Sequence, residues 1–149
     1  MLKKIVIPLI IIVIVITTII TAIIFSINSY KSNLKEIQQL NSDYESYYNT
    51  ELLGTTVISI INKTIHLNEK NGIEKNEKGE YKENDTNSII ITIQFKGNED
   101  KIYTYRMEAI GKQGSEAFVK NFGGFTFKCT KIEYHEKTKM VKSLFIEQI

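Results

Sequence analysis

The sequence has little of the residue types that mark chemistry or covalent cross-links: its 149 residues include one cysteine, two histidines, one proline and no tryptophan. A single cysteine forms no intrachain disulfide, so the fold depends on its hydrophobic core alone. On one unbroken strand Cys129 and His135 would lie about 20 Å apart, and His66 could reach Cys129 only through the fold, which argues against a Cys–His catalytic pair; Cys129 is expected in the core. The patterns of zinc proteases, phosphate loops, dinucleotide sites and EF-hands are also absent. We therefore expect no enzyme, no cofactor and no metal site.

An excess of one charge is also missing from most of the chain. Removing Lys3 and Lys4 from the 19 basic residues leaves 17, which match the 17 acidic residues. The formal charge of +2 thus belongs to the N-terminus, and the rest of the chain is neutral. A nucleic-acid-binding protein needs a basic patch on its folded part, so we expect no nucleic-acid partner.

The chain begins with a long apolar segment. No charged residue lies between Lys4 and Lys31, and these 26 residues would form a helix of roughly 39 Å, longer than the bilayer core of about 30 Å. Residues 5–27 are therefore predicted to form a transmembrane helix, with residues 1–4 in the cytoplasm because Lys3 and Lys4 obey the positive-inside rule. The alternative is a cleaved signal peptide, whose apolar region is shorter and ends at small residues, whereas bulky ones occupy this position. The prediction is a single-pass protein of the cell membrane with an extracytoplasmic C-terminal part.

An amphipathic helical stalk is expected to continue from the membrane over residues 28–53. Its apolar positions recur every three or four residues, and neither proline nor glycine interrupts them. One interpretation is that this stripe packs against the chain's own C-terminal domain, and the other is that it contacts neighbouring subunits. The candidate interaction stripe consists of Tyr30, Leu34, Ile37, Tyr44 and Tyr48.

Residues 54–149 are predicted to form a small extracytoplasmic α+β domain. Gly54 is expected to break the stalk helix, and one of the two threonines after it to cap a second helix that stops at Asn71-Gly72. The β-branched residues at the start of that helix leave a strand as the alternative. A charged loop follows, with a small hairpin at residues 76–79, and residues 115–122 read as a further short helix.

Four antiparallel strands are expected in this domain. Residues 89–95 and 103–107 alternate apolar and polar side chains on either side of a turn, which predicts a hairpin. A third strand is expected at residues 125–135, with a bulge in its middle because its apolar positions change phase there. The fourth strand returns along residues 140–149. The predicted class is thus α+β, with a transmembrane helix, a stalk, and a small four-stranded antiparallel sheet with short helices.

The order of these elements resembles that of type IV pilins and pseudopilins, and the resemblance covers nearly the whole chain as an order of elements. The start MLKKIVIPLI departs from the pilin pattern, since no glycine precedes Gly54 and no acidic residue precedes Glu36. The stretch YNTELLGTTVISIINK, residues 48–63, also looks like small single-span proteins of bacterial surface or conjugation machinery. The resemblance implies a bacterial subunit that packs laterally through its helix in an envelope, secretion or pilus-type apparatus.

Two functions fit this layout. The first is a non-enzymatic, pilin-like structural or assembly component. It would lie in the lipid bilayer and contact other proteins or further copies of itself through its transmembrane helix and its stalk. The alternative is a membrane-anchored extracytoplasmic module that binds a protein or another ligand. A concave apolar pocket between sheet and helix, with Arg106 or tyrosines converging on it, would favour the alternative.

Overall fold

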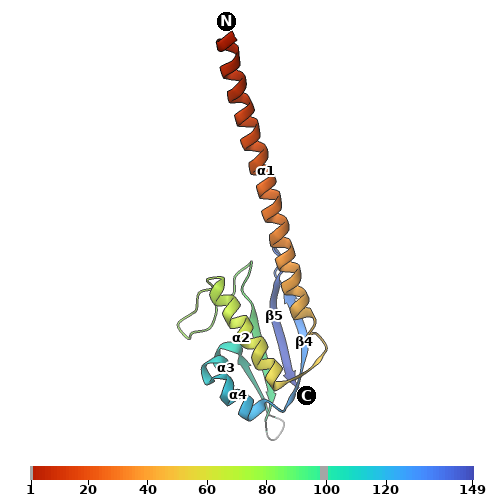
Figure 1. The fold of residues 1–149 in the computed structure, drawn as a ribbon. Coiled ribbons are helices and arrows are strands. Elements are labelled where there is room, and N and C mark those ends of the chain that lie inside the picture. The colour runs from red at the N-terminus through yellow and green to blue at the C-terminus, as the bar shows by residue number, and fades with distance from the viewer. Residues whose placement is uncertain (1, 98–100) are drawn as a thin grey trace. The chain divides into compact units, whose positions relative to one another are not determined.

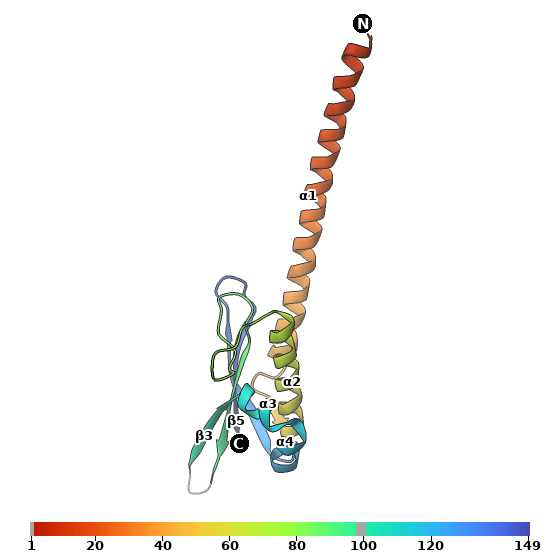
Figure 2. The same cartoon turned by 90° about the vertical axis from the view of Figure 1, so that its left-hand side faces the viewer.

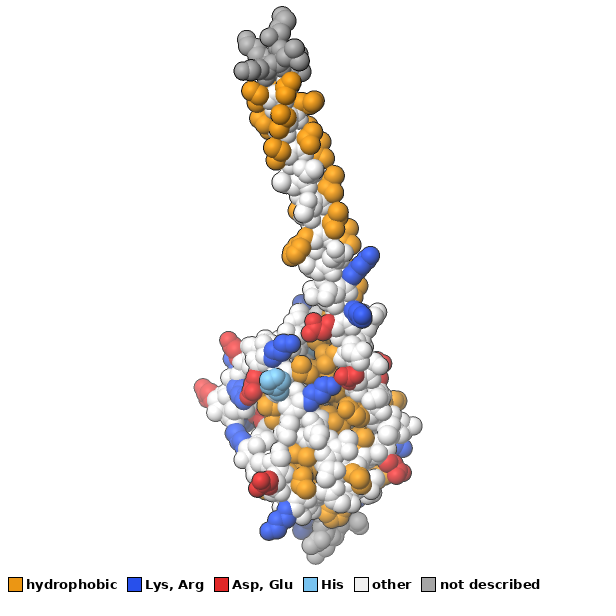
Figure 3. Space-filling view, in the orientation of Figure 1, with side chains coloured by type: hydrophobic (Ala, Val, Ile, Leu, Met, Phe, Trp, Pro, Cys, Tyr) orange, Lys and Arg blue, Asp and Glu red, His pale blue; other side chains and the backbone are white. Residues whose placement is uncertain are grey.

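The structure, a computed structural model, describes residues 2–97 and 101–149. The chain divides after Gln38 into two compact units, and helix α1 (Leu2–Glu45) contributes to both (Figure 1). Among the described residues, α1 is the helix that is long and apolar enough to cross a membrane by length and composition. Apolar side chains cover its described N-terminal half in Figure 3.

The polar groups within the apolar part of α1 find their partners inside the helix itself. The hydroxyls of Thr17, Thr18 and Thr21 donate to carbonyl oxygens three or four residues earlier, at 2.7–2.9 Å. Such bonds leave no side-chain donor unpaired in an apolar environment. The threonines are therefore compatible with a span and need no partner helix.

The second unit is a five-stranded mixed sheet with helices α2, α3 and α4 on one face (Figure 2). The strand order is β1-β4-β5-β2-β3, in which β2 and β5 are parallel and all other neighbours antiparallel. The elements in chain order are β1 (Glu51–Leu53), α2 (Gly54–Lys70), β2 (Ile90–Lys96), β3 (Ile102–Arg106), α3 (Met107–Gln113), α4 (Ser115–Phe122), β4 (Thr126–Tyr134) and β5 (Val141–Gln148).

The predicted α+β class is confirmed, but the prediction of four antiparallel strands is wrong. The hairpin of β4 and β5 inserts between β1 and β2, so that β5 runs parallel to β2 and β1 adds a fifth strand at the edge. Met107 begins α3 instead of ending the preceding strand. Alternating side chains show which face of a strand is buried but not which strand lies beside it, and for this reason the pairing was missed.

Helix α1 ends at Glu45, earlier than the predicted end of the stalk at residue 53. Asn49 has a positive φ of 57°, a conformation that asparagine tolerates better than most residues. Its backbone N–H donates to the carbonyl oxygen of Cys129 at 2.8 Å. This contact with β4 turns the chain away from the helix axis and into β1.

Gly54 serves a different purpose from the predicted helix break. It begins α2 directly after β1, and a Cβ at this position would overlap the carbonyl oxygen of Phe122 at the end of α4. The close approach of two backbones therefore requires glycine here. No side chain caps the helix start. At the other end the predicted stop at Asn71-Gly72 is confirmed, because Gly72 has a positive φ of 67°. Two backbone hydrogen bonds close the last turn of α2. The N–H of Gly72 donates to the carbonyl oxygen of Glu69, and the N–H of Ile73 donates to the carbonyl oxygen of Asn68.

The hydrophobic core lies between the sheet and the helices. As predicted, β2 turns its alternating residues inward, and α2 supplies Val57 and Ile61 from the opposite side. The predicted bulge in β4 is confirmed by a register shift between Cys129 and Lys131. The completely buried side chains also include Tyr44 from the end of α1, so the last turns of α1 belong to the core of this unit.

Candidate functional site

The structure places the five residues of the predicted interaction stripe in different settings. Tyr30 and Leu34 are exposed on α1, with 65% and 39% of their surface accessible, and Ile37 is half-buried. Tyr44 is completely buried, and its hydroxyl pairs with Thr64 of α2 at 2.8 Å, while Tyr48 is exposed beyond the end of α1. Tyr44 thus serves the fold of the domain, as the first interpretation of the stripe proposes.

A groove of about 640 Å³ opens between the β2–β3 hairpin and helices α3 and α4. This volume lies within the range of sites that hold small ligands or side chains of a partner. We call it the tyrosine groove. It is lined by Phe95, Lys96, Gly97, Lys101, Tyr103, Tyr105, Ile110, Gln113, Phe118 and Phe122.

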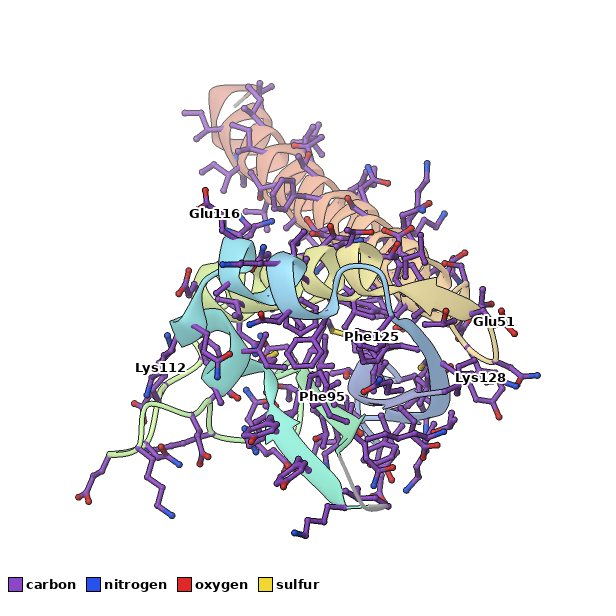
Figure 4. All side chains as sticks on the ribbon, turned by 90° about the horizontal axis from the view of Figure 1, so that it is seen from below. Glu51, Phe95, Lys112, Glu116, Phe125 and Lys128 are labelled. Carbon is purple, nitrogen blue, oxygen red and sulfur yellow. The ribbon has the colours of Figure 1, made fainter. Side chains whose placement is uncertain are left out.

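Phe95 forms the base of the tyrosine groove. Its ring centroid lies 4.7 Å from that of Phe122, 5.8 Å from those of Tyr105 and Phe127, and 6.2 Å from that of Phe118. Edge-to-face and tilted contacts at these distances hold the rings in fixed orientations. Figure 4 views this end of the domain and labels Phe95 between the strands and the helices. The base of the groove is therefore rigid and aromatic.

Two tyrosines of β3 form the open side of the groove. Tyr105 and Tyr103 pair across the strands with Ile93 and Phe95, so their side chains point to the helix-covered face of the sheet. They nevertheless keep 42% and 46% of their surface exposed. The cause is that α3 and α4 pack over the inner strands, where Phe118 is 1% exposed, and leave the edge strand β3 uncovered.

The charged residues at the groove, among the described ones, are Lys96 and Lys101. Arg106 points elsewhere: its guanidinium bonds to the carbonyl oxygen of Tyr81 at 2.9 Å and to the buried carboxylate of Glu108 at 3.2 Å. The structure therefore brings the tyrosines of the hairpin to a pocket between sheet and helix, and it places Arg106 in a structural ion pair.

A second hollow of about 610 Å³ lies beside the β4–β5 turn and is lined largely by charged residues. Both of its lysines are engaged in ion pairs: Lys137 bonds to Asp85 of the same hollow at 2.6 Å, and Lys142 to the neighbouring Glu83 at 3.1 Å. The Lys137 ammonium accordingly lowers the pKa of the Asp85 carboxyl. Because the lysines of this hollow already have carboxylate partners on the surface, it is a weaker candidate for binding an anionic ligand than the tyrosine groove is for binding apolar groups.

The chemistry-bearing side chains that the sequence singled out lie apart from the tyrosine groove. Cys129 is buried, and burial raises the pKa of its thiol to about 11. His135 is buried, and its Nε2 pairs with the carbonyl oxygen of Ser88 at 2.8 Å. Within residues 2–97 and 101–149, no cluster of histidine, cysteine and acidic side chains has the geometry of a metal site.

The sequence signal for the tyrosine groove lies in β3 itself. At its inward positions this strand carries tyrosines, which combine an apolar ring with a polar tip, where the neighbouring β2 carries isoleucine and phenylalanine. Such amphipathic rings suit the boundary between core and solvent. The alternation pattern alone nevertheless predicts ordinary core residues at these aromatic positions and does not predict a site.

No protein-family profile matches the chain, and no curated protein or solved structure matches it significantly.

Proposed function

We propose that this chain is a non-enzymatic, membrane-anchored binding module whose C-terminal domain holds a segment of a partner protein in the tyrosine groove. The observation that carries the proposal is the pair of half-exposed tyrosines beside a rigid aromatic base, in a groove of about 640 Å³. Aromatic side chains are enriched at the centres of protein interfaces, where they bury large area with little loss of side-chain freedom.

The lining of the groove suits binding better than catalysis. Its described residues are aromatic or aliphatic side chains, two lysines, a glutamine and a glycine. General acid–base catalysis needs a titratable group with a suitable pKa beside the reacting atoms, and nucleophilic catalysis needs a nucleophile next to a base. The groove instead offers apolar contact area, with polar tips from the tyrosines.

The apolar helix supports the anchoring part of the proposal. The charge-free stretch before Lys31 is longer than a bilayer core requires, and Lys3 and Lys4 precede it. We propose that this stretch is a single membrane span, with the N-terminus in the cytoplasm and the C-terminal domain outside it. The protein would then hold its partner at the outer surface of the membrane.

Site-specific photo-crosslinking in native membranes tests the proposed function. The variant Tyr105→p-benzoylphenylalanine is expected to yield a discrete adduct with one protein. Tyr134, which is 41% exposed and lies on another part of the domain, is the matched control position because it is also a tyrosine and its exposure is close to the 42% of Tyr105. Equal adduct patterns from both positions, or none from Tyr105, would contradict a specific site in the groove.

A second candidate, a pilin-like assembly component, is favoured by the exposure of Tyr30 and Leu34 on α1. These side chains would contact the helices of neighbouring subunits. In that case Leu34→Glu should abolish crosslinking between neighbouring α1 helices and leave the domain folded. Unchanged crosslinking would remove this candidate.

A further inference from the structure

The ring of Tyr103 lies against the end of the β2–β3 hairpin, although Tyr103 is paired across the strands with Phe95. A Cβ added to Gly97, the residue after β2, would overlap Cε2 of this ring and lie 3.0 Å from its Cδ2. Glycine is therefore the residue that allows the ring to occupy this place. Among the described residues, the rings in contact with that of Phe95 are those of Tyr105, Phe118, Phe122 and Phe127.

This position of the ring keeps the tyrosine groove open. Tyr103 and Gly97 both line the groove, and Phe95 forms its base. A tyrosine side chain turns about χ1 between staggered positions, and a ring that lies next to Gly97 leaves the space over Phe95 free. Tyr103 accordingly keeps 46% of its surface exposed, although it points to the helix-covered face of the sheet.

The contact at Gly97 differs from that at Gly54 in what an added Cβ would displace. At Gly54 the obstacle is a backbone oxygen of α4, whereas at Gly97 it is the edge of a side-chain ring, which can turn. The carbonyl oxygen of Lys101 would lie 3.2 Å from the Cβ, and a shift of a few tenths of an ångström relieves that contact. We therefore expect Gly97→Ala to move the ring of Tyr103 and to leave the domain folded.

A ring displaced from Gly97 gains most by turning over Phe95. There it buries apolar surface against an aromatic base, whereas a ring turned away from the groove would remain in water. A ring over Phe95 fills the space that the groove offers to a partner. The size of the residue at position 97 thus decides whether the groove is open.

We propose that Gly97 is the positioning residue of the tyrosine groove: by making room for the ring of Tyr103, it keeps the space over Phe95 free for an apolar side chain of the partner. This inference rests on the proposed function and identifies what keeps the groove open. Tyr103 contacts the partner, and Gly97 acts through Tyr103.

A purely structural role of the Gly97–Tyr103 pair makes a different prediction. An aromatic ring that covers a strand glycine also stabilises a sheet. In that case substitution at Gly97 would change the free energy of unfolding, and the folded chain would bind its partner as before. The test therefore measures binding and stability on the same variants.

The binding measurement uses photo-crosslinking in native membranes from the full chain with Tyr105→p-benzoylphenylalanine. Addition of Gly97→Ala should lower the adduct yield by at least about tenfold, because a displaced ring overpacks the groove. The matched control is Gly124→Ala, whose Cβ has open space around it, and it should leave the yield unchanged. Pulse proteolysis of the same chains shows whether each variant is folded. An unchanged yield from folded Gly97→Ala would overturn the inference.

A double variant tests whether Gly97 acts through Tyr103. With Tyr103→Ala in place, the Cβ of Gly97→Ala no longer meets a ring, so the double variant should give the same adduct yield as Tyr103→Ala alone. If Gly97→Ala lowers the yield by the same factor with and without Tyr103→Ala, Gly97 does not act through the ring, and the inference is overturned while the proposed function stands.

Nuclear Overhauser effects in the full chain, held in detergent micelles, report the position of the ring without a partner. In the wild-type chain the ring protons of Tyr103 should give a stronger effect to the Hα atoms of Gly97 than to the ring of Phe95. In Gly97→Ala the effect to Phe95 should become the stronger one. A ring that keeps its place, or that turns into solvent, would overturn the inference.

The inference and the proposed function fail in different ways. If the chain with Tyr105→p-benzoylphenylalanine alone forms no specific adduct, the proposed function falls, and the Overhauser effects decide whether Gly97 positions Tyr103. If Gly97→Ala does not fold, the wild-type chain still decides, because a stronger effect from Tyr103 to Phe95 than to Gly97 would overturn the inference.

Discussion

The buried hydrogen bond between Tyr44 and Thr64 offers a quantitative test of how the end of α1 is joined to the domain. Both side chains are completely buried, and their oxygens lie 2.8 Å apart. The hydroxyl of Thr64 also donates to the carbonyl oxygen of Ile60 at 2.8 Å. Because a threonine hydroxyl has one hydrogen, Tyr44 must be the donor in its bond to Thr64.

This assignment predicts unequal effects of the two single substitutions on the free energy of unfolding. Tyr44→Phe removes the donor and leaves the hydroxyl hydrogen of Thr64 satisfied, so the loss should be about 1 kcal/mol. Thr64→Val leaves the buried hydroxyl of Tyr44 without an acceptor, which should cost about 2 kcal/mol. The double variant lacks both hydroxyls, so its free energy of unfolding should fall no further than that of Tyr44→Phe alone. The coupling energy between the two side chains is then about 2 kcal/mol.

Pulse proteolysis of the full chain in a non-ionic detergent, over a series of urea concentrations, measures these free energies. Thr64→Ser is the matched control, because it keeps the hydroxyl and removes one methyl group, at about 1 kcal/mol. Additive losses in the double variant would refute the hydrogen bond. A larger loss for Tyr44→Phe than for Thr64→Val would refute the assignment of the donor.

Three further predictions concern the fold. Gly54→Ala should destabilise the domain by about 2 kcal/mol or more, because its Cβ meets a backbone oxygen of α4, whereas Gly124→Ala, with open space around it, should leave stability unchanged in the same proteolysis assay. The side-chain amide of Asn68 accepts a hydrogen bond from the N–H of Ile89 at 2.9 Å and donates one to its carbonyl oxygen at 2.7 Å. Asn68→Ala should therefore lower the free energy of unfolding by about 3 kcal/mol. A decrease below about 1 kcal/mol would contradict the pairing. Iodoacetamide at pH 8 should leave the buried Cys129 unmodified until the chain unfolds. Burial raises the pKa of its thiol from 9.0 to about 11, so between these values the unfolded chain loses the thiol proton and the folded chain keeps it. The free energy of unfolding should therefore fall as the pH rises from 9 towards 11.

Local patterns predicted the elements whose formation depends on neighbouring residues. The alternation in residues 89–95, the stop at Asn71-Gly72 and the phase change in β4 all appear in the structure. Each is a property of a short stretch of chain, since side-chain direction, left-handed glycine and strand bulges follow from local backbone geometry. The end of α1 at Glu45 was missed because the chain leaves the helix through a contact of Asn49 with distant Cys129.

Composition and order determined that an α+β domain follows an apolar, charge-free segment preceded by two lysines, and that the charges after this segment balance. Tertiary structure decided which strands are neighbours, and with that which strand stands at the edge. It also decided that Tyr44 faces the core while Tyr103 and Tyr105 remain half-exposed. The physical reason is that a side chain's burial depends on which elements cover it, and three helices cover the inner strands of a five-stranded sheet but not β3.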